Sequence, residues 1–554
     1  MNKLIAAIAI SISGITLFSS CNKLDENPKG VLTEINFYKT QNDAIAAVTS
    51  VYSTLTTDVL NDFPLYGRQL NLIVDNPSDN QVYSPSNTNP DVRALGTATY
   101  VSANGRIQKI YAQLYWGINK ANIAIDKIAT IPASAFQNPA NPQANLINEA
   151  KFIRALDYFN LVRLFGPVSL VLHDVSSLSP SAVNIPRSSR DSVYAQIISD
   201  LTDATALPVS NTGSNVGRVT SGAAHALLAK VYVTRQNWAA AKVELEKVIT
   251  AGTAGFTNTT TGNYGYDLFA NFKDAFQSAT KNGKEHIFSA QFNGTSGGFT
   301  STNTLSSFSW TTSQFLADQP ADSTVVENVF SLNDERRSAT FYDSLYNTTT
   351  NATAYWGKAA SGKHNNYQFF KFVDQSKGYG SALQTTQAAN STINFPVIRY
   401  SDVLLLYAEV LSQLNGGPTA DAVNALNIVR GRAYNPVTNL VRNGDYSSYN
   451  YTGNGNYKDH SFDLTVGQFS SETQFLDTVF TERRREFIQE AQRWFDLVRR
   501  TDYGPGQYYL KSIQSMYNYG KPTYKTGVTL RDTIFPIPDV ELQSNPNIKQ
   551  NAGW

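Results

Sequence analysis

Residues 400–432 read YSDVLLLYAEVLSQLNGGPTADAVNALNIVRGR, and this stretch carries the clearest structural signal in the chain. Apolar residues recur in each half at spacings of three and four, which is typical of a helix buried on one face. They are Val403, Leu404, Tyr407, Ala408 and Leu411 in the first half, and Ala422, Val423, Leu426 and Val429 in the second. Asn-Gly-Gly-Pro at 415–418 separates the halves as a turn signal. The stretch predicts two antiparallel helices.

Similar patterns extend outward from this pair. Residues 224–249 form a second helix pair with a turn at 236–237, and longer helical stripes cover 107–128, 146–165 and 191–207. Two antiparallel helices with small residues at the crossing resemble tetratricopeptide units, which bury their apolar faces by stacking. We therefore expect a mostly all-α fold, in which degenerate tetratricopeptide-like pairs form a right-handed scaffold.

Long insertions interrupt this scaffold. They are rich in Asn, Ser, Thr, Gly and aromatic residues, and cover 76–100, 251–320, 340–395 and 435–470. Loops of this length inside a folded protein are usually functional or contain small elements of their own. We expect these insertions to carry a few short strands.

The N-terminus has the layout of a secretory signal. Lys3 precedes an apolar run at 4–18, which is shorter than the roughly 20 residues that a membrane-spanning helix needs. Ser19-Ser20-Cys21 follows, and Cys21 is the only cysteine in the chain. The segment resembles a bacterial lipobox, which implies cleavage before Cys21 and a lipid on its sulfur. The alternative is an ordinary signal peptide with a free thiol.

These features predict the following organisation. Residues 1–20 are a signal peptide, 21–30 a lipidated tether, 31–250 an N-terminal helical region and 251–554 a C-terminal region with insertions, forming one compact unit rather than separable domains. The acidic pair at 25–26 resembles the export signal of surface-exposed lipoproteins. The chain has 45 basic and 44 acidic residues, and cleavage would remove only Lys3 among them, leaving a net charge of zero. This balance argues against a nucleic-acid partner.

Several blocks, in this order, resemble the SusD/RagB family of outer-membrane lipoproteins. They are 187–194 (RSSRDSVY), 224–232 (AHALLAKVY), 396–409 (PVIRYSDVLLLYAE), 427–433 (NIVRGRA), 482–487 (ERRREF) with 493–497 (RWFDL), and 535–538 (FPIP). The resemblance covers nearly the whole mature chain.

The resemblance implies a function at the cell surface. Members of the family bind oligosaccharide or polysaccharide, sit on a SusC-like TonB-dependent transporter of the outer membrane, and deliver ligand without cleaving it. We therefore expect a lipid-anchored, surface-exposed protein with a glycan ligand, a transporter partner, no enzymatic activity and no cofactor. Two alternatives stay open: a peptide- or protein-binding adaptor on the same scaffold, and a surface glycoside hydrolase.

Sugar binding needs aromatic faces together with amide, carboxylate or arginine groups. Three loop regions have this composition, at 75–100, 292–315 and 355–367, and the family resemblance implies that the first two build the ligand site. The candidate ligand-binding residues are Asp75, Asp79, Asn80, Tyr83, Arg93, Trp310, Tyr355 and Trp356. The alternative for each aromatic residue is packing within its own loop.

The hydrolase alternative depends on a predicted helix that begins near Glu482 and ends near Arg500. Glu482, Glu486 and Glu490 are spaced four apart and would share one face. Paired carboxylates carry out glycoside hydrolysis. Neighbouring arginines would instead hold these acids ionised with lowered pKa values. The second interpretation is favoured.

Metal and nucleophile motifs are missing from the sequence. The five histidines are isolated, no HExxH pair, nucleophile elbow or phosphate loop is present, and His225 is expected to be structural. No metal site is predicted, although a structural calcium ion on loop carboxylates stays open. Trp116, off the apolar stripe of its helix, is expected to be buried between stacked helices.

Overall fold

The predicted helices are present with nearly the expected bounds. The computed structural model describes residues 37–554 apart from 58–62, 82–88, 176–178, 250–263, 297–298, 302, 306–322, 343, 348–351, 356–367, 374–390, 435–450, 454–455, 458–459, 519–524 and 526. The predicted stripes correspond to α5 (Gly105–Thr130), α6 (Gln143–Phe165), α8 (Arg190–Ala204), α9 (Ser221–Thr234), α10 (Trp238–Val248), α14 (Tyr400–Asn415) and α15 (Ala420–Ala433). The mostly helical fold is confirmed.

Other helices complete the scaffold. They are α2 (Gln41–Ser53), α3 (Leu70–Asp75), α4 (Pro90–Thr97), α7 (Pro180–Val183), α12 (Ser323–Val329), α13 (Glu335–Thr340), α16 (Glu472–Phe487), α17 (Arg493–Arg499), α18 (Gln507–Asn518) and α19 (Asp539–Ser544). A single π-helical turn, η1 (Leu65–Gln69), leads directly into α3.

Local sequence explains where the main helices begin and end. The Asn104 side chain accepts hydrogen bonds from the first amides of α5, and the Thr419 side chain does the same for α15. Gly166 follows α6 with φ +72°, and Gly416 ends α14 in the left-handed region, where glycine carries no Cβ penalty. These signals are encoded within a few residues, so helix bounds are predictable from sequence.

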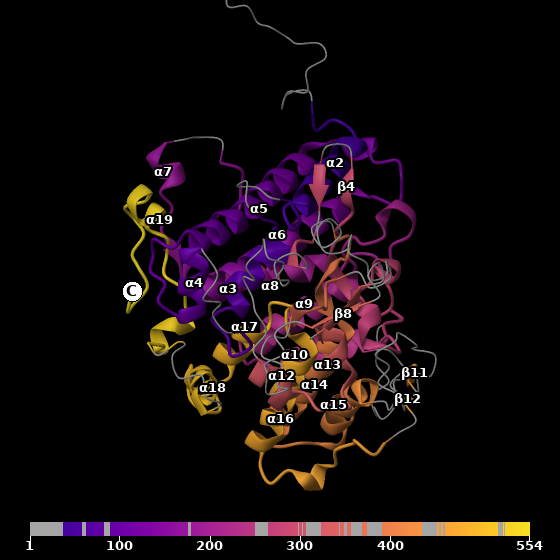
Figure 1. Ribbon diagram of the computed structural model, residues 1–554. Coiled ribbons are helices and arrows are strands. Elements are labelled where there is room, and N and C mark those ends of the chain that lie inside the picture. The colour runs from indigo at the N-terminus through magenta and orange to yellow at the C-terminus, as the bar shows by residue number, and fades with distance from the viewer. Residues whose placement is uncertain are drawn as a thin grey trace, which may run out of the picture.

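The helices stack in chain order. α5 packs on α6, α6 on α8, α8 on α9, α9 on α10, α10 on α14, and α14 on both α15 and α16. Figure 1 shows α5 and α6 at one end of this stack and α14, α15 and α16 at the other. The stacking agrees with a scaffold of helix pairs, while its tetratricopeptide character and right-handed sense stay predictions.

Short antiparallel strand pairs accompany the helices, as predicted. β3 (His286–Ala290) pairs with β10 (Phe395–Arg399), and both strands are buried. The other pairs in the described chain are β1 (Val168–Ser169) with β2 (Arg187–Ser188), β4 (Gly294–Ser296) with β5 (Phe299–Ser301), β6 (Phe341–Tyr342) with β9 (Gln368–Phe369), β7 (Ser344–Asn347) with β8 (Ala352–Tyr355), and β11 (Tyr451–Gly453) with β12 (Asn456–Tyr457). Most of them lie in the predicted insertions.

One large hydrophobic cluster extends from Ala44 in α2 to Ile548 after α19. It therefore includes residues from both predicted regions, although the boundary near 250 falls outside the described residues and stays a prediction. A smaller cluster joins Val325, Val326, Phe330, Phe341 and Phe369 to Ile488.

The expectation for Trp116 was wrong: its ring is only half-buried, and the Lys120 ammonium lies 5.8 Å from the ring centre.

Candidate functional site

The structure packs Gly67 of η1, eight residues before the first predicted ligand region, against residues of the second predicted ligand region. This residue has φ +95°, and a Cβ there would lie 3.0 Å from the Phe292 ring and 3.3 Å from the Asn303 side chain. The Thr304 hydroxyl donates a hydrogen bond to the Gly67 carbonyl at 3.3 Å, and the Asn303 amide donates to the Ser391 carbonyl. Three segments far apart in sequence therefore meet beside η1. Only the absence of a side chain at Gly67 allows this approach.

The polar residues predicted in the first region are buried. Asp75 is 0% exposed, and Asp79 and Asn80 are each 1% exposed. Burial raises the pKa of Asp75 to about 7, although Asn71 donates a hydrogen bond to the carboxylate at 3.0 Å. Any ligand contact by these three residues stays a prediction.

Asp79 and Asn80 attach this loop to α16 and α17. The Asp79 carboxylate accepts two hydrogen bonds from Arg493, at 2.8 and 2.9 Å, and pairs with Arg484 at 3.2 Å. Burial alone would raise the pKa of Asp79, but Arg484 and Arg493 outweigh it and hold the pKa well below its usual range. Asn80 accepts a hydrogen bond from Arg484 at 2.8 Å. In this arrangement both side chains shape the loop from inside.

The remaining candidates lie nearer the surface or beyond the described residues. Arg93 is half-buried on α4. Tyr355 ends β8, where it is paired with Ser344, and only its backbone is described. Tyr83, Trp310 and Trp356 lie outside the described residues, as does the predicted lipid site at Cys21.

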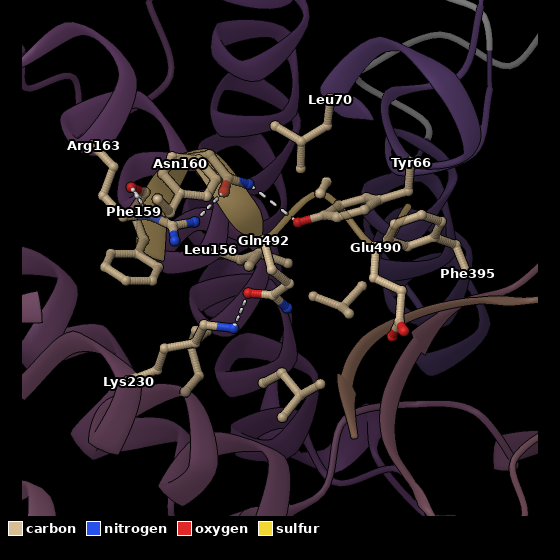
Figure 2. Close-up of a pocket in the computed structure, with 15 residues that line it drawn as sticks. Tyr66, Leu70, Leu156, Phe159, Asn160, Arg163, Lys230, Phe395, Glu490 and Gln492 are labelled. Carbon is tan, nitrogen blue, oxygen red and sulfur yellow. Dashed lines mark hydrogen bonds between the residues drawn. The ribbon is translucent and has the colours of Figure 1, made fainter. Parts of the chain in front are cut away.

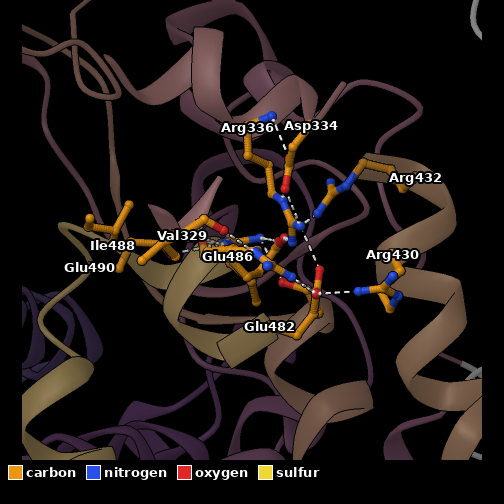
Figure 3. A network of polar contacts seen from close by, with 12 residues as sticks. Val329, Asp334, Arg336, Arg430, Arg432, Glu482, Glu486, Ile488 and Glu490 are labelled. Carbon is orange, nitrogen blue, oxygen red and sulfur yellow. Dashed lines mark hydrogen bonds and ion pairs between the residues drawn. The ribbon is translucent and has the colours of Figure 1, made fainter. Parts of the chain in front are cut away.

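The acidic residues of the hydrolase alternative are part of a buried charge cluster. Its members are Glu285, Asp334, Arg336, Lys371, Arg399, Arg432, Glu482, Glu486 and Glu490. Asp334, Arg336, Arg432, Glu482, Glu486 and Glu490 are labelled in Figure 3. One boundary prediction was wrong: α16 ends at Phe487 and α17 begins at Arg493, so Glu490 lies between two helices rather than on one continuous face. Figure 3 shows the guanidinium groups converging on Glu482 and Glu486.

Three guanidinium groups donate hydrogen bonds to Glu486, the central acid of this cluster. Its carboxylate accepts hydrogen bonds from Arg432 at 2.5 Å, Arg399 at 2.8 Å and Arg336 at 3.1 Å. Burial acts to raise its pKa, and the three guanidinium groups reverse the effect and hold the pKa well below its usual range. A glycosidase acid needs a raised pKa and access to substrate. Glu486 has neither, because the three guanidinium groups lower its pKa and its side chain is 0% exposed.

The sequence predicted arginine partners for these acids but identified mostly the wrong ones. Among the neighbouring arginines of the 482–500 segment, Arg485 pairs with Glu482. Arg483 instead binds Asp402 and Asp496, while Arg484 and Arg493 bind Asp79. The partners of Glu486 come from α13, β10 and α15, and no spacing rule in the sequence would have found them.

A small cavity lies at the centre of the scaffold, between α6, α9, β10 and the turn after α16. It has a volume of about 30 Å³ and is lined by residues including Tyr66, Asn160, Lys230 and Gln492 (Figure 2). Asn160 donates to the Tyr66 hydroxyl at 3.1 Å, and Lys230 donates to Gln492 at 2.7 Å. The volume suits roughly two water molecules and excludes a sugar ring.

His225 has the structural role that was predicted: its Nδ1 lies 2.6 Å from a Glu244 carboxylate oxygen.

Over the described ranges, no group of three His, Cys, Asp or Glu side chains is arranged to hold a metal ion. A search of the same ranges found no helix with the length and apolar character needed to cross a membrane.

Comparisons with known proteins identify the family. A family model described as "SusD family" matches residues 250–554, which is more than half of the chain. The chain belongs to the SusD family. A second model, described as "Starch-binding associating with outer membrane", matches residues 30–233 of this SusD family protein.

Individual relatives match over nearly the whole chain. SusD-like protein P2 of Formosa agariphila is 26% identical and aligns over 96% of each chain. A solved SusD homologue from Bacteroides thetaiotaomicron has a TM-score of 0.73 and 24% identity, over 94% of this chain and 99% of the homologue. A solved laminarin-binding SusD-like protein has a TM-score of 0.67 and 25% identity, over 93% of this chain and 100% of that one. The resemblance inferred from the sequence blocks is confirmed.

Proposed function

We propose that this SusD family protein is a lipid-anchored glycan-binding protein on the outer face of the outer membrane, and that it passes its ligand to a SusC-like TonB-dependent transporter. The observation that carries the proposal is the family match over both halves of the chain. The laminarin-binding relative supports a polysaccharide as the ligand class.

The interior of the protein favours binding over hydrolysis. The carboxylates suggested for glycoside hydrolysis are ion-paired and inaccessible, and the central cavity is too small for a sugar. A polymer ligand is therefore expected on the surface, over the three predicted loop regions. We assign the contacts to Tyr83, Arg93, Trp310, Tyr355 and Trp356, with Asp75, Asp79 and Asn80 beneath the first loop.

A glycan array on the soluble form that lacks residues 1–21 tests the binding function. We expect retention of at least one polysaccharide and no release of new reducing ends during long incubation. Sustained release of reducing ends would favour the hydrolase alternative. Indifference to every glycan together with tight peptide binding would favour the adaptor.

Site variants test the loop assignment separately. In electrophoresis through a gel that contains the polysaccharide, the Tyr83→Ala and Trp310→Ala variants should each be retained less than the parent chain. Their far-UV circular dichroism should be unchanged. Loss of one stacking contact costs about 1 kcal/mol, or about fivefold in affinity. Unchanged retention in both variants would remove the assignment and leave the function standing.

Mass spectrometry of native material tests the anchor at Cys21. We expect a mature N-terminus at Cys21 that carries acyl chains. An unacylated N-terminus would remove the membrane attachment from the proposal.

A further inference from the structure

One side of the long helix α5 carries partly exposed residues. The buried residues of α5, which include Ile110, Leu114 and Gly117, pack on α2, α3 and α6. Five other residues lie within about 60° of one another around the helix axis, on the opposite side. They are Lys109, Trp116, Lys120, Ile123 and Lys127, and all five are half-buried. We call these five residues the lysine face.

The lysine face combines positive charge with an aromatic ring. The Lys120 ammonium lies 5.8 Å from the centre of the Trp116 ring. The carboxylate at the border of the face, Asp126, is directed toward another segment: it accepts a hydrogen bond from the Asp174 amide at 2.9 Å and lies 3.1 Å from a His173 ring nitrogen. Tryptophan and lysine both join an apolar body to a polar end, and this suits them to the boundary between water and a membrane.

The chain enters the structure beside this face. Gln41 begins α2, and its side chain donates hydrogen bonds to the Asn138 and Asn141 carbonyls at 2.8 Å each. The Gln143 side chain in turn donates to the Ile128 carbonyl, at the end of α5. The start of α2 therefore lies near the C-terminal end of α5, and Figure 1 shows the two helices together at the top of the molecule.

The residues just before α2 have the same character as the lysine face. Phe37 and Tyr38 are half-buried, with 4.7 Å between their ring centres, and Lys39 is exposed. Residues 22–36 separate Phe37 from Cys21, so a lipid on Cys21 lies at most about 55 Å from Phe37 even if this segment is fully extended. The tether therefore holds the lysine face near the membrane at a high effective concentration.

We propose that the lysine face of α5, together with Phe37, Tyr38 and Lys39, docks on an anionic membrane surface. The proposal rests on the lipid anchor proposed above, and it adds a second, reversible contact with the same membrane. The ammonium groups pair with anionic headgroups, while the Trp116 ring and the apolar stems of the lysines lie at the level of those headgroups. This contact sets which side of the scaffold faces the lipid.

Co-sedimentation with lipid vesicles tests the docking without the anchor. The soluble form that lacks residues 1–21 is mixed with vesicles of phosphatidylcholine alone, or of phosphatidylcholine and phosphatidylglycerol in equal amounts. This form has no net charge, so binding to the anionic vesicles requires a local positive patch. We expect sedimentation with the anionic vesicles only, and its loss at about 0.5 M sodium chloride. Equal sedimentation with both kinds of vesicle, or with neither, overturns the proposal.

Two variants test the assigned residues. Lys39→Gln and Lys120→Gln should each weaken the partition onto anionic vesicles about fivefold, the contribution of one lysine near an anionic surface. Lys247→Gln is the matched control, because it removes the same charge from a side chain of α10 that is 44% exposed, and it should leave the partition unchanged. Far-UV circular dichroism checks that each variant is folded. Equal weakening by all three changes, or unchanged partition of both Lys39→Gln and Lys120→Gln, overturns the docking face.

The anchor is read separately by mass spectrometry of Cys21. An acylated Cys21 in a protein whose soluble form ignores anionic vesicles would remove the docking face and leave the anchor standing. Vesicle binding by the soluble form would support the face even if Cys21 were found without acyl chains.

Discussion

Substituting Glu482 by Gln tests whether the buried charge cluster stabilises the scaffold. Glu482 is 0% exposed and pairs with Arg336 at 2.5 Å, and with Arg430 and Arg485 at 3.1 Å each. Burial would raise the pKa of Glu482, but the three guanidinium groups lower it from its ordinary 4.5 to about 2. At about 1.4 kcal/mol per pH unit, this difference corresponds to about 3 kcal/mol of stabilisation at neutral pH.

The sign of the pH dependence follows from the lowered pKa. Because the folded-state pKa lies below the unfolded-state pKa, the stabilisation is fully present above the unfolded value of 4.5 and is lost as the pH falls toward 2. About 2 kcal/mol of it should be lost by about pH 3. Glu482→Gln should therefore lower the free energy of unfolding by about 3 kcal/mol at pH 7, and by only about 1 kcal/mol at pH 3.

Urea unfolding followed by far-UV circular dichroism at the two pH values measures this difference. Asp203→Asn is the matched control: Asp203 pairs with Lys151 at 2.6 Å, but the two side chains are 48% and 24% exposed, so the change should cost less than about 1 kcal/mol. A Glu482→Gln variant as stable as the parent chain at pH 7 would refute the reasoning. So would a loss that does not shrink with acidification.

Three further predictions concern buried groups and close contacts. Asp157 is buried without a hydrogen-bond partner in the described chain, and burial raises its pKa well above the usual range. Ionisation of Asp157 therefore lowers stability as the pH rises above about 4. Asp157→Asn should raise the free energy of unfolding at pH 7 by about 1–2 kcal/mol, and its thermal midpoint should no longer fall with rising pH. Gly117→Ala would place a Cβ 2.1 Å from the Asp157 carboxylate and should lower the free energy of unfolding by about 1–3 kcal/mol. In a double-mutant cycle, Asp157→Ala should partly reverse this loss, and simple additivity of the two changes would contradict the contact. Asn551→Ala removes hydrogen bonds from the Asn551 side chain to the Phe165 and Phe535 carbonyls, at 3.0 and 2.8 Å. The change should lower the free energy of unfolding by about 2 kcal/mol and speed amide hydrogen exchange at the end of α6. Unchanged exchange there would show that the C-terminal tail does not stabilise the end of α6.

Helix formation and family membership were predictable because their signals are local. Apolar spacing marks all four of the helices α5, α6, α14 and α15. An Asn or Thr cap sets the start of α5 and α15, and a following glycine sets the end of α6 and α14. The break between α16 and α17 was not predictable in this way, since residues 488–492 contain neither glycine nor proline. Two side chains from elsewhere in the chain stabilise this break. Arg399 and Lys371 both donate hydrogen bonds to the Glu486 carbonyl, and Lys371 also donates to the Glu490 carboxylate.

The sequence by itself determined a helical SusD family chain, because periodic burial, capping and the ordered family blocks are written in neighbouring residues. Only the tertiary structure decided which polar side chains face inward. Asp79 and Glu486 look like exposed loop and helix-surface acids in sequence, yet both are buried against arginines that lie far away along the chain, such as Arg493 for Asp79 and Arg336, 150 residues from Glu486. These two buried carboxylates stay ionised because guanidinium groups converge on them, and that convergence exists only once the helices have stacked.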